Sequence, residues 1–186
     1  MRLSFSCADT AYCDFLRQTD PCVPYTMDKK ETRPFVGVVF EINGINYYAP
    51  LSSPKSKHLK MKNQIDFLKI NEGKWGAINF NNMIPIHKNS LTKVEMKILP
   101  GDAKEDRIYK DLLNNQLDWC NANQRAIVSR AARLYDTIVH GRGTLALVNR
   151  CCRFAANEGQ YIKFCQENNF TLLAQGASKS AEKPIL

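Results

Sequence analysis

The segment that most constrains the fold is a β-hairpin predicted in the first third of the chain. Phe35–Ile42 (FVGVVFEI) and Ile45–Leu51 (INYYAPL) are rich in β-branched and aromatic residues, which favour strands. Between them lies Asn43-Gly44, a pair preferred in two-residue hairpin turns because both positions need positive φ. The hairpin predicts an antiparallel sheet, and the residues after Leu51 then leave from a rigid platform.

Shorter strands are expected downstream of this hairpin. Thr92–Leu99 alternates apolar and charged side chains, as a strand with one buried face does. Asp66–Ile70 and Gly76–Phe80 are further candidates. MIPIH is expected to form only a short edge piece, because Pro85 cannot donate a ladder hydrogen bond.

Helical patterns lie before and after the strands. A short helix is predicted over Asp9–Arg17, with Asp9 or Thr10 as its cap. The polar stretch TMDKKETRP that follows is interpreted as an exposed loop.

After Pro100-Gly101 the apolar residues recur at helical spacing. We expect a helix with Asp102 as a candidate cap, then helices over Gln124–His140 and Leu145–Gln166.

The chain contains no internal repeat and no credible linker. It therefore predicts a single α+β domain over residues 1–170, followed by a polar C-terminal tail over residues 171–186.

The net charge indicates the kind of partner, and the apolar runs and the cysteine count indicate the cellular compartment. Lys and Arg total 26 against 18 acidic residues, and the net charge of +8 favours a polyanion such as nucleic acid or an anionic membrane surface. No apolar run is long enough to span a bilayer and no secretory signal is recognised, so we expect a cytoplasmic protein. The odd count of seven cysteines favours free thiols.

The sequence carries none of the common metal-binding or cofactor-binding motifs. The sequence lacks Cys-x-x-Cys, the phosphate-binding glycine loops and the HExxH and GxSxG motifs. No two of His58, His87 and His140 share a helical face. We therefore expect no metal site and no cofactor.

The stretch YYAPLSSPKSKHLKMK, Tyr47 to Lys62, carries an unusual set of polar residues just past the hairpin. Metal-free cleavage of an RNA phosphodiester requires that the 2′-hydroxyl lose a proton, that the charged phosphorane be stabilised and that the leaving oxygen be protonated. Hydroxyls, cations and an imidazole are supplied together by Ser52, Ser53, Lys55, Lys57 and His58. The alternative interpretation is a solvated Ser-Pro-Lys turn followed by scattered lysines.

Two blocks of the sequence resemble a known family. RPFVGVVFEINGINYYAPLSSPKSKH followed by WGAINFNNMIPI is similar to the ToxN/AbiQ family, the toxins of type III toxin–antitoxin systems. The specific part is Pro-Leu-Ser-Ser-Pro-Lys, and Tyr12, Val23-Pro24 and Arg33-Pro34-Phe35 also fit. The resemblance covers roughly residues 1–165, more loosely in the helical half.

This resemblance implies a fold, an activity and partners. The implied fold is a twisted, mainly antiparallel sheet with surrounding helices, related in form to the Kid/MazF-like toxin ribonucleases. The implied activity is metal-independent RNA cleavage that leaves a 2′,3′-cyclic phosphate and a 5′-hydroxyl. The implied partners are target RNA and a repeated pseudoknot antitoxin RNA, which the toxin processes and with which it assembles into closed alternating complexes. The implied role is abortive infection against phage or plasmid maintenance.

Site residues are carried over from the family by position. Ser53 and Lys55 match positions in the catalytic segment of the family, and Ser52 matches a position that holds threonine or serine. His58 matches the histidine of the family, and Tyr12 matches its N-terminal tyrosine. Lys55 is expected to stabilise the phosphorane, whereas the general base stays open between Ser53, His58 and Tyr12. Some members have tryptophan where this chain has Lys57, which leaves its base preference open because lysine cannot stack on a base.

Further residues are candidates for RNA binding. Tyr47, Tyr48 and Trp75 could stack on bases, although burial in the sheet is the more common role of such side chains. The candidates that would contact the backbone or the bases of RNA are Lys57, Lys60, Lys62, Lys29, Lys30, Arg33, Lys69, Lys74, Asn81 and Asn82.

Two other functions are compatible with the net charge of +8. A non-catalytic RNA-binding protein would use the lysine segment only to grip phosphates. A membrane-surface protein ranks last, because no predicted helix pairs a strongly basic face with an aromatic apolar one.

Overall fold

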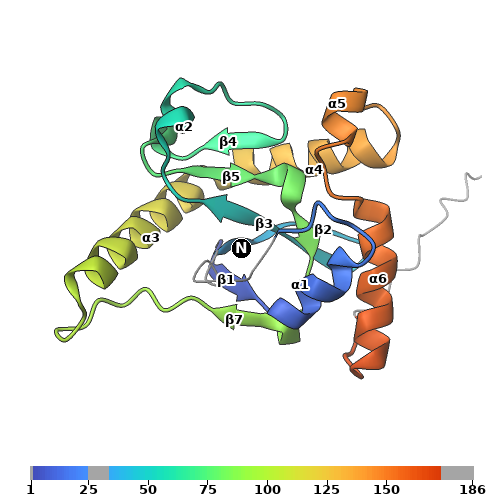
Figure 1. Cartoon of the computed structure of the whole chain (residues 1–186), viewed down its shortest axis with the longest axis horizontal. Coiled ribbons are helices and arrows are strands. Elements are labelled where there is room, and N and C mark those ends of the chain that lie inside the picture. Colours follow the sequence, from blue (N-terminus) through green and yellow to red (C-terminus); the bar gives the residue numbers. More distant parts are fainter. Residues whose placement is uncertain (1, 25–33, 173–186) are drawn as a thin grey trace, which may run out of the picture.

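The computed structural model describes residues 2–24 and 34–172. Its centre is a seven-stranded sheet in the order β4-β5-β3-β2-β1-β7, with β6 pairing alongside β3 and every pairing antiparallel. Figure 1 shows the sheet between helices on several sides. The strands are β1 (Phe5–Ala8), β2 (Phe35–Ile42), β3 (Ile45–Ser52), β4 (Phe67–Lys69), β5 (Ala77–Asn79), β6 (Ile84–Pro85) and β7 (Leu91–Lys93).

The predicted hairpin is confirmed. Asn43 and Gly44 have φ values of 50° and 76°, as the turn requires, and Ile42 pairs with Ile45 across it. Further along, the rings of Phe40 and Tyr47 stack with their centroids 4.6 Å apart. The short edge piece around Pro85 is confirmed as β6. The candidates around β4 and β5 are confirmed, each shorter by one residue at either end.

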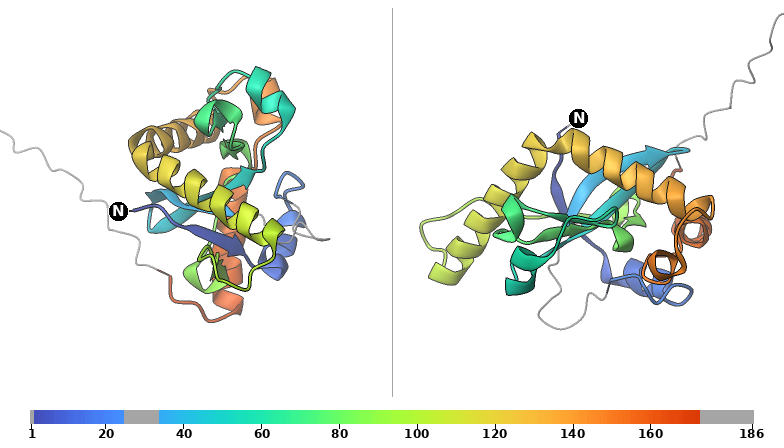
Figure 2. Two further views of the ribbon diagram at one scale, coloured as in Figure 1. Left: turned by 90° about the vertical axis from the view of Figure 1, so that its left-hand side faces the viewer. Right: turned by 90° about the horizontal axis from the view of Figure 1, so that it is seen from above.

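The helices cover the sheet unevenly. α1 and α6 contact each other at one end of the molecule, α4 contacts β2, and α3 projects from the body (Figures 1 and 2). The helices are α1 (Thr10–Arg17), α2 (Ser56–Lys60), α3 (Lys104–Ala122), α4 (Gln124–Val139), α5 (Leu145–Val148) and α6 (Phe154–Glu167). No helix of the described residues is both long and apolar enough to cross a membrane.

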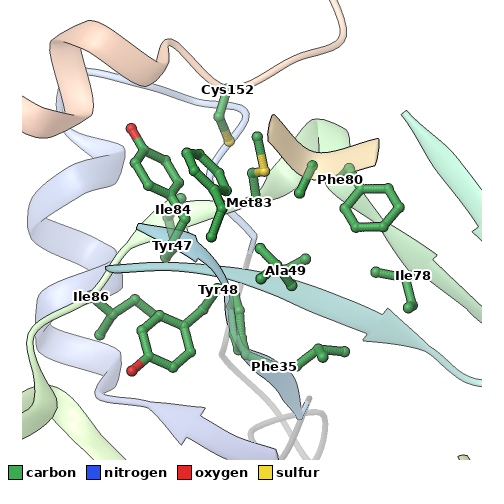
Figure 3. Packing of buried hydrophobic residues seen from close by; sticks show 14 of the residues in the cluster. Phe35, Tyr47, Tyr48, Ala49, Ile78, Phe80, Met83, Ile84, Ile86 and Cys152 are labelled. Atoms are coloured by element: carbon green, nitrogen blue, oxygen red, sulfur yellow. The ribbon is translucent and has the colours of Figure 1, made fainter. Parts of the chain in front are cut away.

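The core lies around β3, where the sheet meets α4 and α6. Figure 3 shows Tyr47 and Met83 packed among other buried apolar residues, and both are fully buried. The hydroxyls of Tyr47 and Tyr135 donate to the same Glu158 carboxylate oxygen at 2.8 and 2.7 Å. This shared acceptor satisfies both hydroxyls and ties α4 and α6 to β3.

The prediction of a strand over Thr92–Leu99 is wrong in length. The strand ends at Lys93, and only the amide of Val94 continues the pairing, by donating to the Phe5 carbonyl at 3.2 Å. The partner strand, β1, was missed by the sequence reasoning. Because β1 begins at Phe5, the residues after Val94 have no strand to pair with, although their sequence alternates.

Two predictions about the helices are also corrected. Asp102 does not cap α3, because its carboxylate accepts from the Leu99 amide at 2.8 Å and from Lys110 at 2.7 Å. The helix expected over Leu145–Gln166 is two helices, because the connecting Cys152 amide bonds instead to the Asn81 carbonyl at 2.7 Å.

The helix predicted over Asp9–Arg17 is confirmed, with Asp9 as its cap. The predicted exposed loop at residues 25–33 lies outside the described residues. Of the predicted tail only Thr171 and Leu172 are described, and the Thr171 carbonyl lies 3.2 Å from His87 Nε2. The boundary at residue 170 stays a prediction.

Candidate active site

The candidate site begins where β3 ends. Ser52 is the last residue of β3 and pairs with Ala77 of β5. Its hydroxyl accepts a 2.5 Å hydrogen bond from the Asn79 side-chain amide. Ser53 follows at the end of the strand and is exposed. Ser52 is therefore held in place by the sheet, whereas Ser53 faces solvent; Asn79 was missed by the sequence reasoning, since one asparagine in a strand carries no signal.

Two glycines let the backbone around Ser53 pack tightly. Gly76 has a φ of 97°, and a Cβ atom there would overlap the Ser52 carbonyl oxygen and approach Pro54. Gly73 has a φ of 91°, and a Cβ there would lie 2.7 Å from the His58 carbonyl oxygen. The segment between β4 and β5 therefore braces both ends of the candidate site, which side chains at these positions would prevent.

Lys55 precedes a short helix rather than a continuing loop. The Lys55 carbonyl accepts from the His58 amide at 2.8 Å and so starts α2. The side chains of Lys55, Lys57 and Lys60 are exposed, whereas His58 points inward. The segment therefore combines features of a solvated turn and of a site, because α2 presents cations outward and buries the imidazole of His58.

His58 is only 2% exposed and packs edge-on against Phe67, with ring centroids 5.6 Å apart. Its Nδ1 is buried and has no hydrogen-bond partner among the described residues. Burial lowers the pKa of His58, and the charges of Lys57 and Lys55 lower it further. The imidazole is therefore held neutral near pH 7 and retains a nitrogen that can accept a proton.

Tyr12 is not where the family resemblance suggested. Its ring is fully buried under α6 and contacts Phe164, and its hydroxyl donates to the Pro85 carbonyl at 2.5 Å. Burial raises the pKa of Tyr12 well above its usual value. A hydroxyl sealed in the core and already committed to a carbonyl cannot reach RNA in this conformation, so the expectation that Tyr12 acts at the site is wrong for this structure.

The candidate RNA-binding lysines among the described residues differ in exposure. Lys57, Lys60, Lys62 and Lys74 are exposed, and Lys69 is partly buried. Lys29, Lys30 and Arg33 lie outside the described residues.

Asn81 and Asn82 are partly buried, and their contact with RNA stays a prediction. Asn81 donates to the Arg150 carbonyl at 3.0 Å, and Asn82 donates to the Cys22 carbonyl at 2.8 Å. Both side-chain amides are used to fasten loops of the protein.

Aromatic and sulfur side chains are structural here. Tyr47 and Tyr48 are buried in the sheet, and Trp75 is partly buried. All seven cysteines are free thiols, and burial raises the pKa of Cys13 to about 12, so that thiol is unreactive. Within residues 2–24 and 34–172 no three His, Cys, Asp or Glu side chains are grouped as metal ligands.

The arrangement of sheet and helices is similar to that of solved structures of type III toxin–antitoxin proteins. A structure reported as "New insights into the mechanism of bacterial Type III toxin-antitoxin systems: selective toxin inhibition by a non-coding RNA pseudoknot" superposes with a TM-score of 0.72 at 27% identity, over 88% of this chain and 98% of that one. A structure of AbiQ, reported as a lactococcal anti-phage endoribonuclease, shares the fold with a TM-score of 0.75 at 20% identity, over 89% and 99% of the two chains. The fold is therefore that of the ToxN and AbiQ toxins.

Sequence comparison assigns the family. Residues 4–163 match the family described as "Toxin ToxN, type III toxin-antitoxin system", and the chain belongs to this family. Endoribonuclease ToxN of Pectobacterium atrosepticum is 29% identical over 173 residues, which cover 89% of this chain and 95% of the relative. The family resemblance is thereby confirmed, whereas the likeness to Kid and MazF stays a prediction.

Proposed function

We propose that this chain is the toxin of a type III toxin–antitoxin system and cleaves RNA by intramolecular transesterification. The ribose 2′-hydroxyl attacks the adjacent phosphorus, the bond to the 5′-oxygen breaks, and the products carry a 2′,3′-cyclic phosphate and a 5′-hydroxyl. No metal is needed in this proposal. Membership of the ToxN family and the relative named as an endoribonuclease support RNA cleavage.

The observation that carries the proposal is the exposed Ser53 and Lys55 at a braced strand end. Lys55 supplies a compact positive charge for the non-bridging oxygens of the phosphorane. Ser53 donates its hydroxyl to the same phosphate group. Ser52, held by Asn79, fixes the strand end from which both side chains extend. Pre-organised donors of this kind stabilise charge as it develops in the transition state.

Ser53 and His58 are the two candidates for the general base once Tyr12 is set aside. His58 is neutral near pH 7 and has accepting capacity, but its 2% exposure means that RNA must uncover its ring. Ser53 is exposed but requires its own proton acceptor. The two candidates give different pH profiles.

The proposed partners are target RNA and an antitoxin RNA. The net charge of +8 and the exposed lysines of α2 suit a polyanion. One structural relative is reported with selective inhibition by a non-coding RNA pseudoknot. By analogy, this chain is proposed to process and be inhibited by a repeated pseudoknot RNA, in a closed alternating complex, in a cytoplasmic defence against phage or in plasmid maintenance.

The test compares Lys55→Ala with Lys97→Ala, a matched loss of an exposed lysine beyond β7. In the presence of a chelator, Lys55→Ala should cleave RNA more slowly by a factor on the order of 100 to 1,000, because a charge that stabilises the transition state is lost. Lys97→Ala should cleave at the wild-type rate. A non-catalytic RNA-binding protein would instead show no cleavage by any of the three proteins and a modest loss of affinity in Lys55→Ala.

A further inference from the structure

A second basic surface lies on α4. Residues 126, 129, 130 and 133 are spaced so that they form one stripe along that helix. Opposite them runs the chain that leaves α2 and loops back into β4 (Figure 1). A concave surface, called here the α4 concavity, is lined by Asn63, Gln64, Ile65, Ala126, Ser129, Arg130 and Arg133.

Among the described residues, neither arginine of the α4 concavity forms an ion pair with a carboxylate. Arg130 donates through Nη1 to the Gln64 carbonyl, and its Nε is buried with no hydrogen-bond partner among the described residues. Arg133 is exposed, and no ion pair is found for it in the described part of the chain. Burial and the neighbouring Arg133 charge lower the pKa of Arg130. The positive charges of Arg130 and Arg133 thus repel each other, and no carboxylate in residues 2–24 and 34–172 pairs with either of them.

Two carboxylates close in sequence to the residues of the concavity already have basic partners. Asp66 accepts from Arg150 Nε at 2.5 Å and from Nη2 at 3.2 Å, a bidentate pair. Asp136, three residues beyond Arg133 on α4, pairs with Arg142 and with His140. These pairs leave the charge of Arg130 and Arg133 available to an anion.

The opposite wall of the concavity is rigid. Gln64 and Phe67 exchange backbone hydrogen bonds at 2.9 and 3.3 Å, and the Asn63 side chain accepts from the Lys69 amide at 2.8 Å. The Gln64 side chain also accepts from Arg150 at 3.2 Å. A turn fastened in this way holds the carbonyl that orients Arg130, so that the guanidinium is positioned before any ligand arrives.

We propose that the α4 concavity binds a backbone phosphate of RNA, at a distance along the strand from the phosphate that is cleaved. Guanidinium groups suit phosphate because their planar fork matches two oxygens. Asn63, which lines the concavity, directly follows the exposed Lys62, so the segment that carries Lys55, Lys57, Lys60 and Lys62 leads into one wall of the concavity. This inference rests on the proposed function in taking RNA as the ligand.

The experiment measures RNA affinity directly, so that its result does not depend on cleavage. Arg133→Glu is introduced into a Lys55→Ala background, and binding of a labelled single-stranded RNA pool of randomised sequence is titrated at several salt concentrations. Arg107→Glu serves as the matched charge reversal, since Arg107 is an exposed arginine near the far end of α3. Arg130→Lys, which keeps the charge but removes the planar fork, is the second variant.

We expect Arg133→Glu to weaken binding by a factor on the order of ten or more. The fall of log affinity with log salt should become less steep, its slope decreasing in magnitude by about 1. Arg130→Lys should weaken binding less, and Arg107→Glu should match its parent. Equal losses in Arg133→Glu and Arg107→Glu would show only the effect of net charge and would overturn the inference, as would an unchanged affinity in Arg133→Glu. If the wild type failed to cleave RNA while Arg133→Glu still lost affinity, the proposed function would fall and the phosphate site would stand.

Discussion

Single residues decide whether the strand end can hold its shape, and Gly76 is the clearest case. Its φ of 97° and its approach to the Ser52 carbonyl leave no room for a side chain. We expect Gly76→Ala to lower the free energy of unfolding by about 2 kcal/mol or more, from backbone strain and the clash. Gly101→Ala is the control, because a Cβ there meets nothing within 4 Å. Denaturant titration of both variants checks this, and equal stabilities would contradict it.

His58 is a second residue whose environment predicts a measurable effect. Its folded pKa lies below the usual value of 6.5, so the unfolded chain binds the proton more tightly. The contribution of neutral His58 to stability is therefore fully present above pH 6.5 and is lost as pH falls through the lowered folded pKa. In His58→Gln, denaturant titrations across this range should lack that part of the pH dependence; an unchanged slope would mean that burial does not perturb the imidazole.

The same variant separates the two candidate bases. If His58 accepts the proton, His58→Gln should slow cleavage by a factor on the order of 100 or more and remove the acid limb of the pH–rate profile. If Ser53 does so through another acceptor, the acid limb persists in His58→Gln.

Among the elements, α6 depends most visibly on a distant residue. Asp20 is fully buried and accepts from the Arg153 amide at 2.6 Å, from the Asn157 side chain at 2.8 Å and from the Cys22 amide at 3.0 Å. Its negative charge also lies at the helix N-terminus, where the helix dipole favours it. Asp20 therefore joins the segment after α1 to the start of α6.

Removing the Asp20 carboxylate should destabilise the folded protein. We expect Asp20→Ala to lower the free energy of unfolding by about 3 kcal/mol, because one buried and two partly buried hydrogen bonds lose their acceptor. Asp14→Ala, which removes a surface pair with Arg17, should change it by less than ~0.5 kcal/mol. Thermal or chemical unfolding of the two variants provides the comparison; a small effect in Asp20→Ala would mean that water replaces the carboxylate.

Some helices and strands could be predicted from the sequence, and others could not. The hairpin and α1 followed from local signals, Asn43-Gly44 and the Asp9 cap, which act over a few residues. The short strand β1 and the early end of β7 depend on pairing between segments far apart in the chain. The break between α5 and α6 depends on Asn81 and Asp20, which no local pattern connects to that position.

The candidate site, like the secondary-structure elements, was predictable where local sequence decides and not where distant segments meet. Ser53 and Lys55 stood out because hydroxyl and cation follow a predicted strand directly. The roles of Asn79, Gly73 and Gly76 are visible only once β4 and β5 pack against β3. The burial of Tyr12 was not predictable, because residue type and position do not reveal that a polar side chain is committed inside the fold.

For the molecule as a whole, one small sheet serves both the fold and the proposed chemistry. The core around β3 fixes the strand, and the end of that strand carries the residues proposed to meet RNA. The net charge of +8 is the complement that a polyanionic ligand requires. The central claim is that this strand end turns a bound phosphodiester into a cyclic phosphate without a metal.

Identification of the cut ends tests that claim most directly. Purified protein, freed of bound transcript and treated with chelator, is incubated with RNA, and the termini of the fragments are determined by mass spectrometry. We predict 2′,3′-cyclic phosphate and 5′-hydroxyl ends, which disappear in Lys55→Ala. Intact RNA, or fragments with 3′-hydroxyl and 5′-phosphate ends, would contradict the claim, because attack by water is not what this site is proposed to direct.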